Sequence, residues 1–170
     1  DMGGKKGALI DIVKVSMPPE FVDAYKRFAE AGWASISLPS EIGGGGMPIA
    51  LSGGTLEILS SANLAFGLAP GLSAGAISAI NFHGSEEQKE KFLPKLVSGE
   101  WTGTMNLSEP QSGSDLGTIT TKAEPQDDGT YKITGTKVGN TFGEHDMTDK
   151  IIHLAVSETH LTLPQRDIWG

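Results

Sequence analysis

The chain has 170 residues, an apolar fraction of 38% and a formal net charge of −8 at pH 7, from 13 lysines and arginines against 21 aspartates and glutamates. This apolar content can build the core of one domain or two small ones, and the acidic balance lacks the basic surface of a nucleic-acid-binding protein. The absence of cysteine excludes disulfides, thiolate metal sites and a cysteine nucleophile.

The sequence also gives no sign of membrane insertion or export. No continuous apolar run approaches the length that spans a bilayer, and residues 1–13 lack the long apolar stretch of a signal peptide. We therefore expect a cytoplasmic protein without a membrane span.

The first half of the chain is predicted to be helical. Residues 18–31 should form a helix, because apolar residues share one face, two prolines suit its first turn and Gly32 can end it. Residues 32–48 contain too many turn formers for regular structure and predict an ordered loop. Helix should return at Pro48, where residues suited to a buried face recur every three to four positions: Leu51, Thr55, Ile58, Leu59 and Ala62.

Two further helices are expected before residue 100. Residues 72–82 should form the first, ended by Gly84 in the left-handed conformation, with a buried stripe of Ala76, Ile77 and Ile80. In the second, over residues 85–98, Ser85 and Gln88 have the spacing of a capping box, and Pro94 predicts a kink or an early end.

After Gly99 the sequence changes to short β-type runs separated by turn residues. These runs occupy residues 100–107, 118–124, 130–138 and 150–156, with a hairpin turn at 127–129 and a turn at Gly135 that offers a further strand. The expected fold class is therefore α+β: an α-helical domain over residues 1–100, followed by a small antiparallel β domain over residues 101–170.

The tract at residues 105–117, MNLSEPQSGSDLG, is the most unusual part of the β region. Met105 and Leu107 alternate with polar residues and Pro110 stops ladder pairing, which predicts a strand ending in a loop. Exposed hydroxyls, backbone amides and a glycine suit a flat polar heterocycle or a pantetheine-like amide chain. Taken alone, the composition favours the simpler interpretation that serine and glycine form turns.

The order of three stretches changes this balance. They read GWASISLPSEIGGGG, then NFHGSEEQKEKFLPKLVSGEWTGTMNLSEPQSGSDLG, then TKAEPQDDGTYKITGTKVGNTFGEHD, and together they resemble the acyl-CoA dehydrogenase family, above all its bacterial long-chain branch. The likeness covers about residues 30–155. It implies a helical domain, a β domain and a C-terminal four-helix domain, of which the last is absent from this sequence.

The resemblance implies FAD as cofactor and an acyl-CoA as substrate. Backbone groups of Met105 and Leu107 and the hydroxyl of Ser108 would face the flavin ring. Gly113 would permit close approach, and Ser114 would contact both cofactor and acyl-CoA.

A second flavin contact of the family comes from a strand that here covers residues 137–141. Gly139, Asn140 and Thr141 are the residues carried over, and Thr141 matches a hydroxyl near flavin N5. Gly139 replaces an aromatic residue that packs against the ring, a contact whose burial typically contributes about 1.5 to 3 kcal/mol.

The resemblance also bears on catalysis. In the family, a Glu of the C-terminal domain removes the substrate α-proton, a hydride passes to flavin, and electrons leave through an electron-transferring flavoprotein. No residue here matches that base, so none is assigned as catalytic, and Glu109 is interpreted as a structural residue that ties down its loop.

Residues 157–170 resemble nothing in the family. A diverged loop would explain them, but a truncated or frame-shifted coding sequence explains them better, because whole structural elements are missing. Uncovered sheet edges and helix faces should then drive self-association into a homo-oligomer.

The remaining polar residues and the overall layout leave room for other functions. Glu144, His145, Asp146 and His153 match no recurrent ligand spacing, so no metal is expected. Two alternatives stay open: an acyl-CoA oxidase, which shares the layout but passes electrons to oxygen, and a non-catalytic, self-associating binding module.

Overall fold

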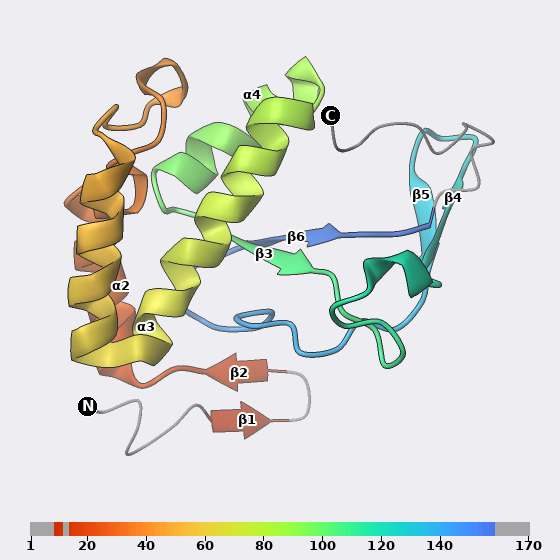
Figure 1. The fold of residues 1–170 in the computed structure, drawn as a ribbon, viewed down its shortest axis with the longest axis horizontal. Helices are drawn as coiled ribbons and strands as arrows, with labels where there is room; N and C mark the ends of the chain where they lie inside the picture. The colour runs from red at the N-terminus through yellow and green to blue at the C-terminus, as the bar shows by residue number, and fades with distance from the viewer. Residues whose placement is uncertain (1–8, 12–13, 159–170) are drawn as a thin grey trace. The chain divides into compact units, whose positions relative to one another are not determined.

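The computed structural model describes residues 9–11 and 14–158, and Figure 1 shows their arrangement. The helices and strands follow in chain order as β1 (Leu9–Asp11), β2 (Lys14–Ser16), α2 (Pro19–Glu30), α3 (Ile49–His83), α4 (Glu86–Val97), β3 (Thr102–Asn106), β4 (Lys122–Pro125), β5 (Tyr131–Thr134) and β6 (Ile151–Ala155). Three short 3-10 helices are interspersed: η1 (Trp33–Ser35), η2 (Ser40–Ile42) and η3 (Leu116–Thr118). Helices followed by strands agree with the expected α+β class.

The chain divides into two compact units. Of the described residues, unit 1 contains those up to Met105 together with Thr141–Leu154, and unit 2 contains Asn106–Asn140 together with residues 155–158. The expected division into domains over residues 1–100 and 101–170 stays a prediction.

Helix α2 forms as its sequence predicts. Pro19 occupies its first turn, where the missing N–H costs no hydrogen bond, and the buried residues Phe21, Tyr25 and Phe28 share one face. The Tyr25 hydroxyl donates to the Gly99 carbonyl at 3.1 Å, and burial raises the pKa of Tyr25 to about 12.

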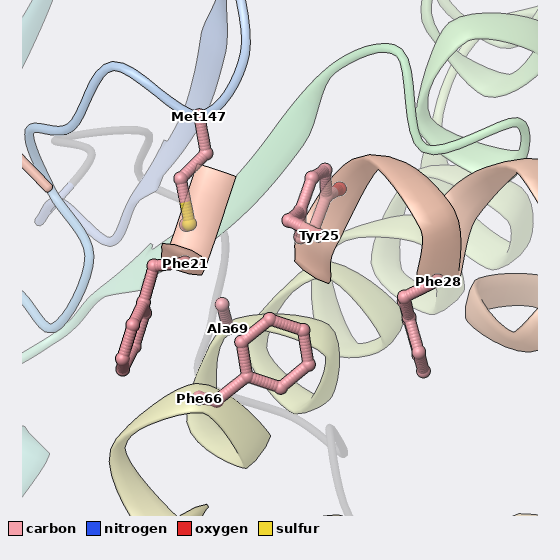
Figure 2. Close-up of a cluster of buried hydrophobic side chains, with 6 residues drawn as sticks. All are labelled: Phe21, Tyr25, Phe28, Phe66, Ala69 and Met147. Carbon is pink, nitrogen blue, oxygen red and sulfur yellow. The ribbon is translucent and has the colours of Figure 1, made fainter. Parts of the chain in front are cut away.

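The first apolar cluster joins α2 to α3. Figure 2 shows the Phe66 ring between those of Phe21 and Phe28, with centroids 5.8 and 6.0 Å away and both pairs edge to face. Tyr25, Ala69 and Met147 complete the buried group. Edge-to-face contacts of this kind add to the stabilisation that burial provides.

Helix α3 differs from the two separate helices expected here. It runs from Ile49 to His83 with one interruption at Asn63, whose φ of −160° and ψ of 103° are not helical. The Asn63 side chain accepts a hydrogen bond from the Phe66 amide at 3.1 Å, so it caps a second helical segment that begins well before residue 72. Residues 64–71, including Pro70, are helical, and the expected gap there was wrong.

The end of α3 also corrects an expectation. Gly84 has an extended backbone, with φ −69° and ψ 150°, rather than a left-handed one. A Cβ at this position would lie 2.5 Å from the Ile80 carbonyl oxygen, so the glycine is needed for close approach and not for a positive φ.

Helix α4 confirms the predicted capping box and excludes the early end that was one of two outcomes expected at Pro94. The Ser85 hydroxyl accepts from the Gln88 amide at 3.2 Å, and the Gln88 side chain accepts from the Ser85 amide at 2.9 Å. Pro94 does not end the helix, which continues to Val97. Burial of the last turn outweighs the lost hydrogen bond, in a second apolar cluster of Ile77, Ile80, Leu93, Leu96 and Val97.

The strands pair in twos. Strands β1 and β2, which the sequence did not predict, form an antiparallel hairpin. Strand β3 pairs with β6 in the same direction, so this pair is not antiparallel as expected. Strands β4 and β5 form the predicted hairpin around the turn at 127–129, where Gln126 donates to the Thr130 carbonyl at 2.8 Å. No strand follows Gly135 among the described residues before β6.

One described helix, α3, is long and apolar enough to cross a membrane. The sequence did not indicate it, because its apolar residues are interrupted by polar ones. Core helices of soluble proteins share this length and composition, and α3 is partly buried.

Candidate cofactor site

The tract at residues 105–117 continues from β3 into a loop that is organised around Glu109. This residue is buried, with only 3% of its surface exposed, and its carboxylate accepts hydrogen bonds from several donors. The donors are Gln111 Nε2 at 2.7 Å, Thr120 N at 2.8 Å, Thr120 Oγ1 and Thr121 N at 3.0 Å, Thr121 Oγ1 at 2.5 Å and Lys137 Nζ at 2.9 Å.

These contacts determine the ionisation of Glu109. The hydrogen bond from the Thr121 hydroxyl, supported by Lys137 and by the amides of Thr120 and Thr121, outweighs burial and holds the pKa of Glu109 far below its usual range. A carboxylate of such low pKa is a poor proton acceptor. Its hydrogen bonds are those of a structural residue that stabilises the loop.

The second organising residue is Lys137. Its ammonium donates to the Leu107 carbonyl at 3.0 Å as well as to the Glu109 carboxylate. One residue further on, the Val138 amide donates to the Ser108 carbonyl at 3.0 Å. Residues 107–109 and 137–138 therefore lie side by side within unit 2.

The loop after Glu109 is closed by hydrogen bonds of its own. Glu109 and Ser112 exchange backbone hydrogen bonds at 2.7 and 3.0 Å, and the buried Ser112 hydroxyl donates to the Asp115 carbonyl at 2.6 Å. Gly113 and Ser114 form the exposed tip, and a Cβ at Gly113 would meet nothing within 4 Å. Space for a ligand to approach is thus present at this glycine.

The other predicted site residues fall in both units. Met105 and Thr141 belong to unit 1, whereas Leu107, Ser108, Gly139 and Asn140 belong to unit 2. Residues 137–141 do not form the expected strand, because Gly139 has a φ of +66° and ends any extended run. The assignment of all these residues to flavin, and of Ser114 to acyl-CoA, stays a prediction.

The hydroxyl groups among the predicted site residues have hydrogen-bonding capacity left for a ligand. Within the described part of the chain, no hydrogen bond engages the side-chain hydroxyls of Ser108, Ser114 or Thr141. A hydroxyl donates and accepts, and a flavin ring presents both kinds of partner. The apolar side of the fit is poorer, because Gly139 supplies no side chain against which the ring can pack.

A second polar cluster, which the sequence reasoning missed, lies along β3 in unit 1. The buried Thr102 hydroxyl is 3.0 Å from His145 Nε2, and the buried Thr104 hydroxyl is 2.7 Å from His153 Nδ1. The alternation of the two threonines on one strand face was the available signal. No group of three or more potential metal ligands occurs among the residues that the structure describes.

The comparisons with known proteins agree on one family. Residues 11–100 match the family model described as acyl-CoA dehydrogenase, N-terminal domain. A 3-methylmercaptopropionyl-CoA dehydrogenase of Ruegeria pomeroyi is 47% identical over 93% of this chain and 27% of its own length.

Solved structures show the same relationship. A glutaryl-CoA dehydrogenase from Mycobacterium smegmatis superposes with a TM-score of 0.73 at 27% identity, covering 84% of this chain and 35% of that one. An acyl-CoA dehydrogenase from Bacillus anthracis complexed with FAD gives a TM-score of 0.61 at 34% identity, covering 69% of this chain and 20% of that one.

The matches extend over most of this chain but over a small part of each relative. The chain spans about a quarter of the length of the curated relatives it matches. The relation to the long-chain branch stays a prediction. The family model covers 90 of the 170 residues, and the expected fold is confirmed by the superposed structures. This chain belongs to the acyl-CoA dehydrogenase family.

Proposed function

We propose that this chain forms part of the flavin and acyl-CoA sites of an FAD-dependent enzyme that introduces an α,β double bond into a fatty acyl-CoA thioester. The supporting observation is the hydrogen-bond network that links Glu109 to Thr120, Thr121 and Lys137. Beside this network, the Ser108 and Ser114 hydroxyls have no hydrogen bond within the described chain. The relatives named as acyl-CoA dehydrogenases, one of them complexed with FAD, support the same chemistry.

The roles of the chain's own residues follow from their hydrogen bonds. The Leu107 carbonyl accepts a hydrogen bond from Lys137. The backbone group of Leu107 that would donate to the cofactor is its amide. The Ser108 carbonyl is likewise engaged by Val138, so Ser108 acts through its hydroxyl. Bound FAD would supply the hydride acceptor, and these donors would orient its ring and stabilise negative charge that develops in the reaction.

The catalytic base is not assigned to this chain. Glu109 is the buried carboxylate of the tract, but its donors hold it ionised and hydrogen-bonded. The proposal therefore assigns to the described residues the binding and orientation of cofactor and substrate. An electron-transferring flavoprotein as electron acceptor belongs to the same proposal, on the strength of the family resemblance. A cytoplasmic location is proposed from the sequence alone.

A homo-oligomer is proposed as well. Helix α3 carries a series of large apolar side chains that are exposed: Ile49, Leu51, Leu56, Ile58, Leu64, Leu68 and Phe82. Glu57 is the only acidic or basic residue of α3 apart from His83 at its end. Exposed apolar side chains of this number support association with another apolar surface.

Titration of the purified chain with FAD tests the cofactor site. We expect saturable quenching of flavin fluorescence and a flavin absorption spectrum that persists after removal of unbound FAD. Replacing one hydroxyl, in Ser108→Ala or Thr141→Ala, should weaken binding by about fivefold to tenfold, as expected for one lost hydrogen bond.

Ser35→Ala, in η1 of unit 1, is the matched control and should leave the affinity unchanged. A chain that retains no flavin from excess FAD, while its circular dichroism shows a folded protein, would contradict the proposal.

A further inference from the structure

Lys137 connects two segments of unit 2 that are far apart in the sequence. Its ammonium donates to the Leu107 carbonyl and to the Glu109 carboxylate, at 3.0 and 2.9 Å. The adjacent Val138 amide donates to the Ser108 carbonyl. Backbone and side-chain bonds thus join residues 107–109 to residues 137–138 at consecutive positions.

The ion pair within this connection is buried. The side chains of Lys137 and Glu109 are 10% and 1% exposed. Burial of two charges is costly unless their geometry and further hydrogen bonds compensate for the lost water. Glu109 has such bonds from Gln111, Thr120 and Thr121, none of which depends on Lys137.

Glu109 and Lys137 therefore stabilise different segments of the chain. The Glu109 carboxylate organises residues 109–121 and also receives Lys137. Lys137 has a narrower role, because its two acceptors in the described chain both lie in residues 107–109. Loss of the Lys137 ammonium should release residues 137–140 while the loop around Glu109 keeps its other donors.

We infer that Lys137 is a positioning residue, which joins the segment at residues 107–108 to the segment at residues 137–140 and thereby sets the affinity of the chain for flavin. The inference rests on the proposed function, in which residues of both segments contact the cofactor. Lys137 acts through the backbone, since its ammonium is engaged by Leu107 and Glu109.

Amide hydrogen exchange without flavin tests the connection directly. In Lys137→Met, which keeps most of the length of the side chain but not its donors, the Val138 amide should exchange about tenfold faster. The Thr120 and Thr121 amides should keep their protection, because Glu109 remains their acceptor. Glu109→Gln should instead accelerate exchange at all three amides, because an amide group cannot accept from every donor around it.

Flavin titration of the same variants tests the positioning role. Lys137→Met should raise the dissociation constant for FAD about tenfold, whereas Lys137→Arg, which keeps the charge and the donors, should restore most of the affinity. Lys132→Met is the matched control, because Lys132 is exposed on β5 in the same unit. It should change neither exchange nor affinity.

Each outcome decides a separate point. Unchanged exchange at Val138 in Lys137→Met would show that Lys137 does not join the segments. Faster exchange with an unchanged FAD affinity would leave Lys137 a purely structural residue and overturn its positioning role. If the unmodified chain binds no FAD, the proposed function fails and the effect on flavin fails with it, while exchange at Val138 still decides whether the connection exists.

Discussion

His145 is a buried histidine whose two ring nitrogens have different partners. Nδ1 accepts a hydrogen bond from the Met147 amide at 3.2 Å, so the proton of the neutral ring lies on Nε2, which donates to the Thr102 hydroxyl. Thr102 can then donate to Thr148, 3.3 Å away, and Thr148 donates to the Lys150 carbonyl at 3.0 Å. These hydrogen bonds all run in one direction, from His145 Nε2 towards the Lys150 carbonyl. A second proton on His145 would occupy Nδ1, which could then no longer accept from the Met147 amide.

This arrangement predicts a dependence of stability on pH. Burial lowers the pKa of His145, against the opposing charges of Glu144 and Asp146. The unfolded chain therefore takes up the proton first, and the stabilisation is complete above about pH 6.5 and is lost as the pH falls towards the folded pKa. The Tm should decrease between neutral and mildly acid pH, by about 2–4 °C for each kcal/mol of unfolding free energy.

Thermal unfolding followed by circular dichroism over this pH range provides the measurement. His145→Gln should have a lower Tm at neutral pH and a smaller slope of Tm against pH. His83→Gln, at the exposed end of α3, should keep the slope of the unmodified protein. Equal slopes for both variants would show that His145 does not titrate with unfolding.

Prediction from the sequence worked best where the deciding signal is local. The capping box of Ser85 and Gln88, the turn at 127–129 and the apolar face of α2 are each determined by neighbouring residues. Gly84 was misjudged because a close carbonyl decides its conformation. The early end, one of two outcomes expected at Pro94, does not occur because the last turn of α4 is buried. The flavin residues came from family resemblance, and local sequence alone favoured turns for them.

The start of α4 supplies a prediction at the scale of elements. Ser85→Ala removes one half of the capping box, which should lower the free energy of unfolding by about 1 kcal/mol. Urea denaturation should show this as a lower midpoint at unchanged slope.

Ser61→Ala is the matched control for this change. Ser61 lies on the exposed face of α3 and donates to the Glu57 carbonyl of its own helix at 2.7 Å. Alanine is favourable inside a helix, so this variant should be neutral or slightly more stable. A Ser85→Ala variant as stable as the control would mean that the cap contributes nothing.

At the scale of the whole molecule, the exposed side chains of α3 lead to a prediction about association. Ile58 is 71% exposed and Leu64 is 64% exposed, although Phe66 and Ala69 of the same helix are buried in the core. The sequence spacing of Leu51 and Ile58 predicted the helix but not their exposure, because periodicity shows which residues share a face but not what covers it.

Multi-angle light scattering over a range of concentrations measures this association. We expect a mass above that of the 17.8 kDa monomer, rising with concentration. The double variant Ile58→Lys, Leu64→Lys should return the mass towards that of the monomer. Lysines introduced at the exposed positions Tyr131 and Ile133 of the β4–β5 hairpin provide a control. A clean monomer at high concentration would contradict the proposal.

The two units differ in what fills their interiors. Both apolar clusters of the described chain belong to unit 1, whereas the buried side chains described in unit 2 are polar, among them Glu109, Ser112 and Thr121. Exposure of apolar area raises the heat capacity of a protein and exposure of polar area lowers it. Unfolding of unit 2 should therefore change the heat capacity little, and the enthalpy of this unfolding should stay nearly constant with temperature. The free energy of unfolding of unit 1 should instead curve with temperature.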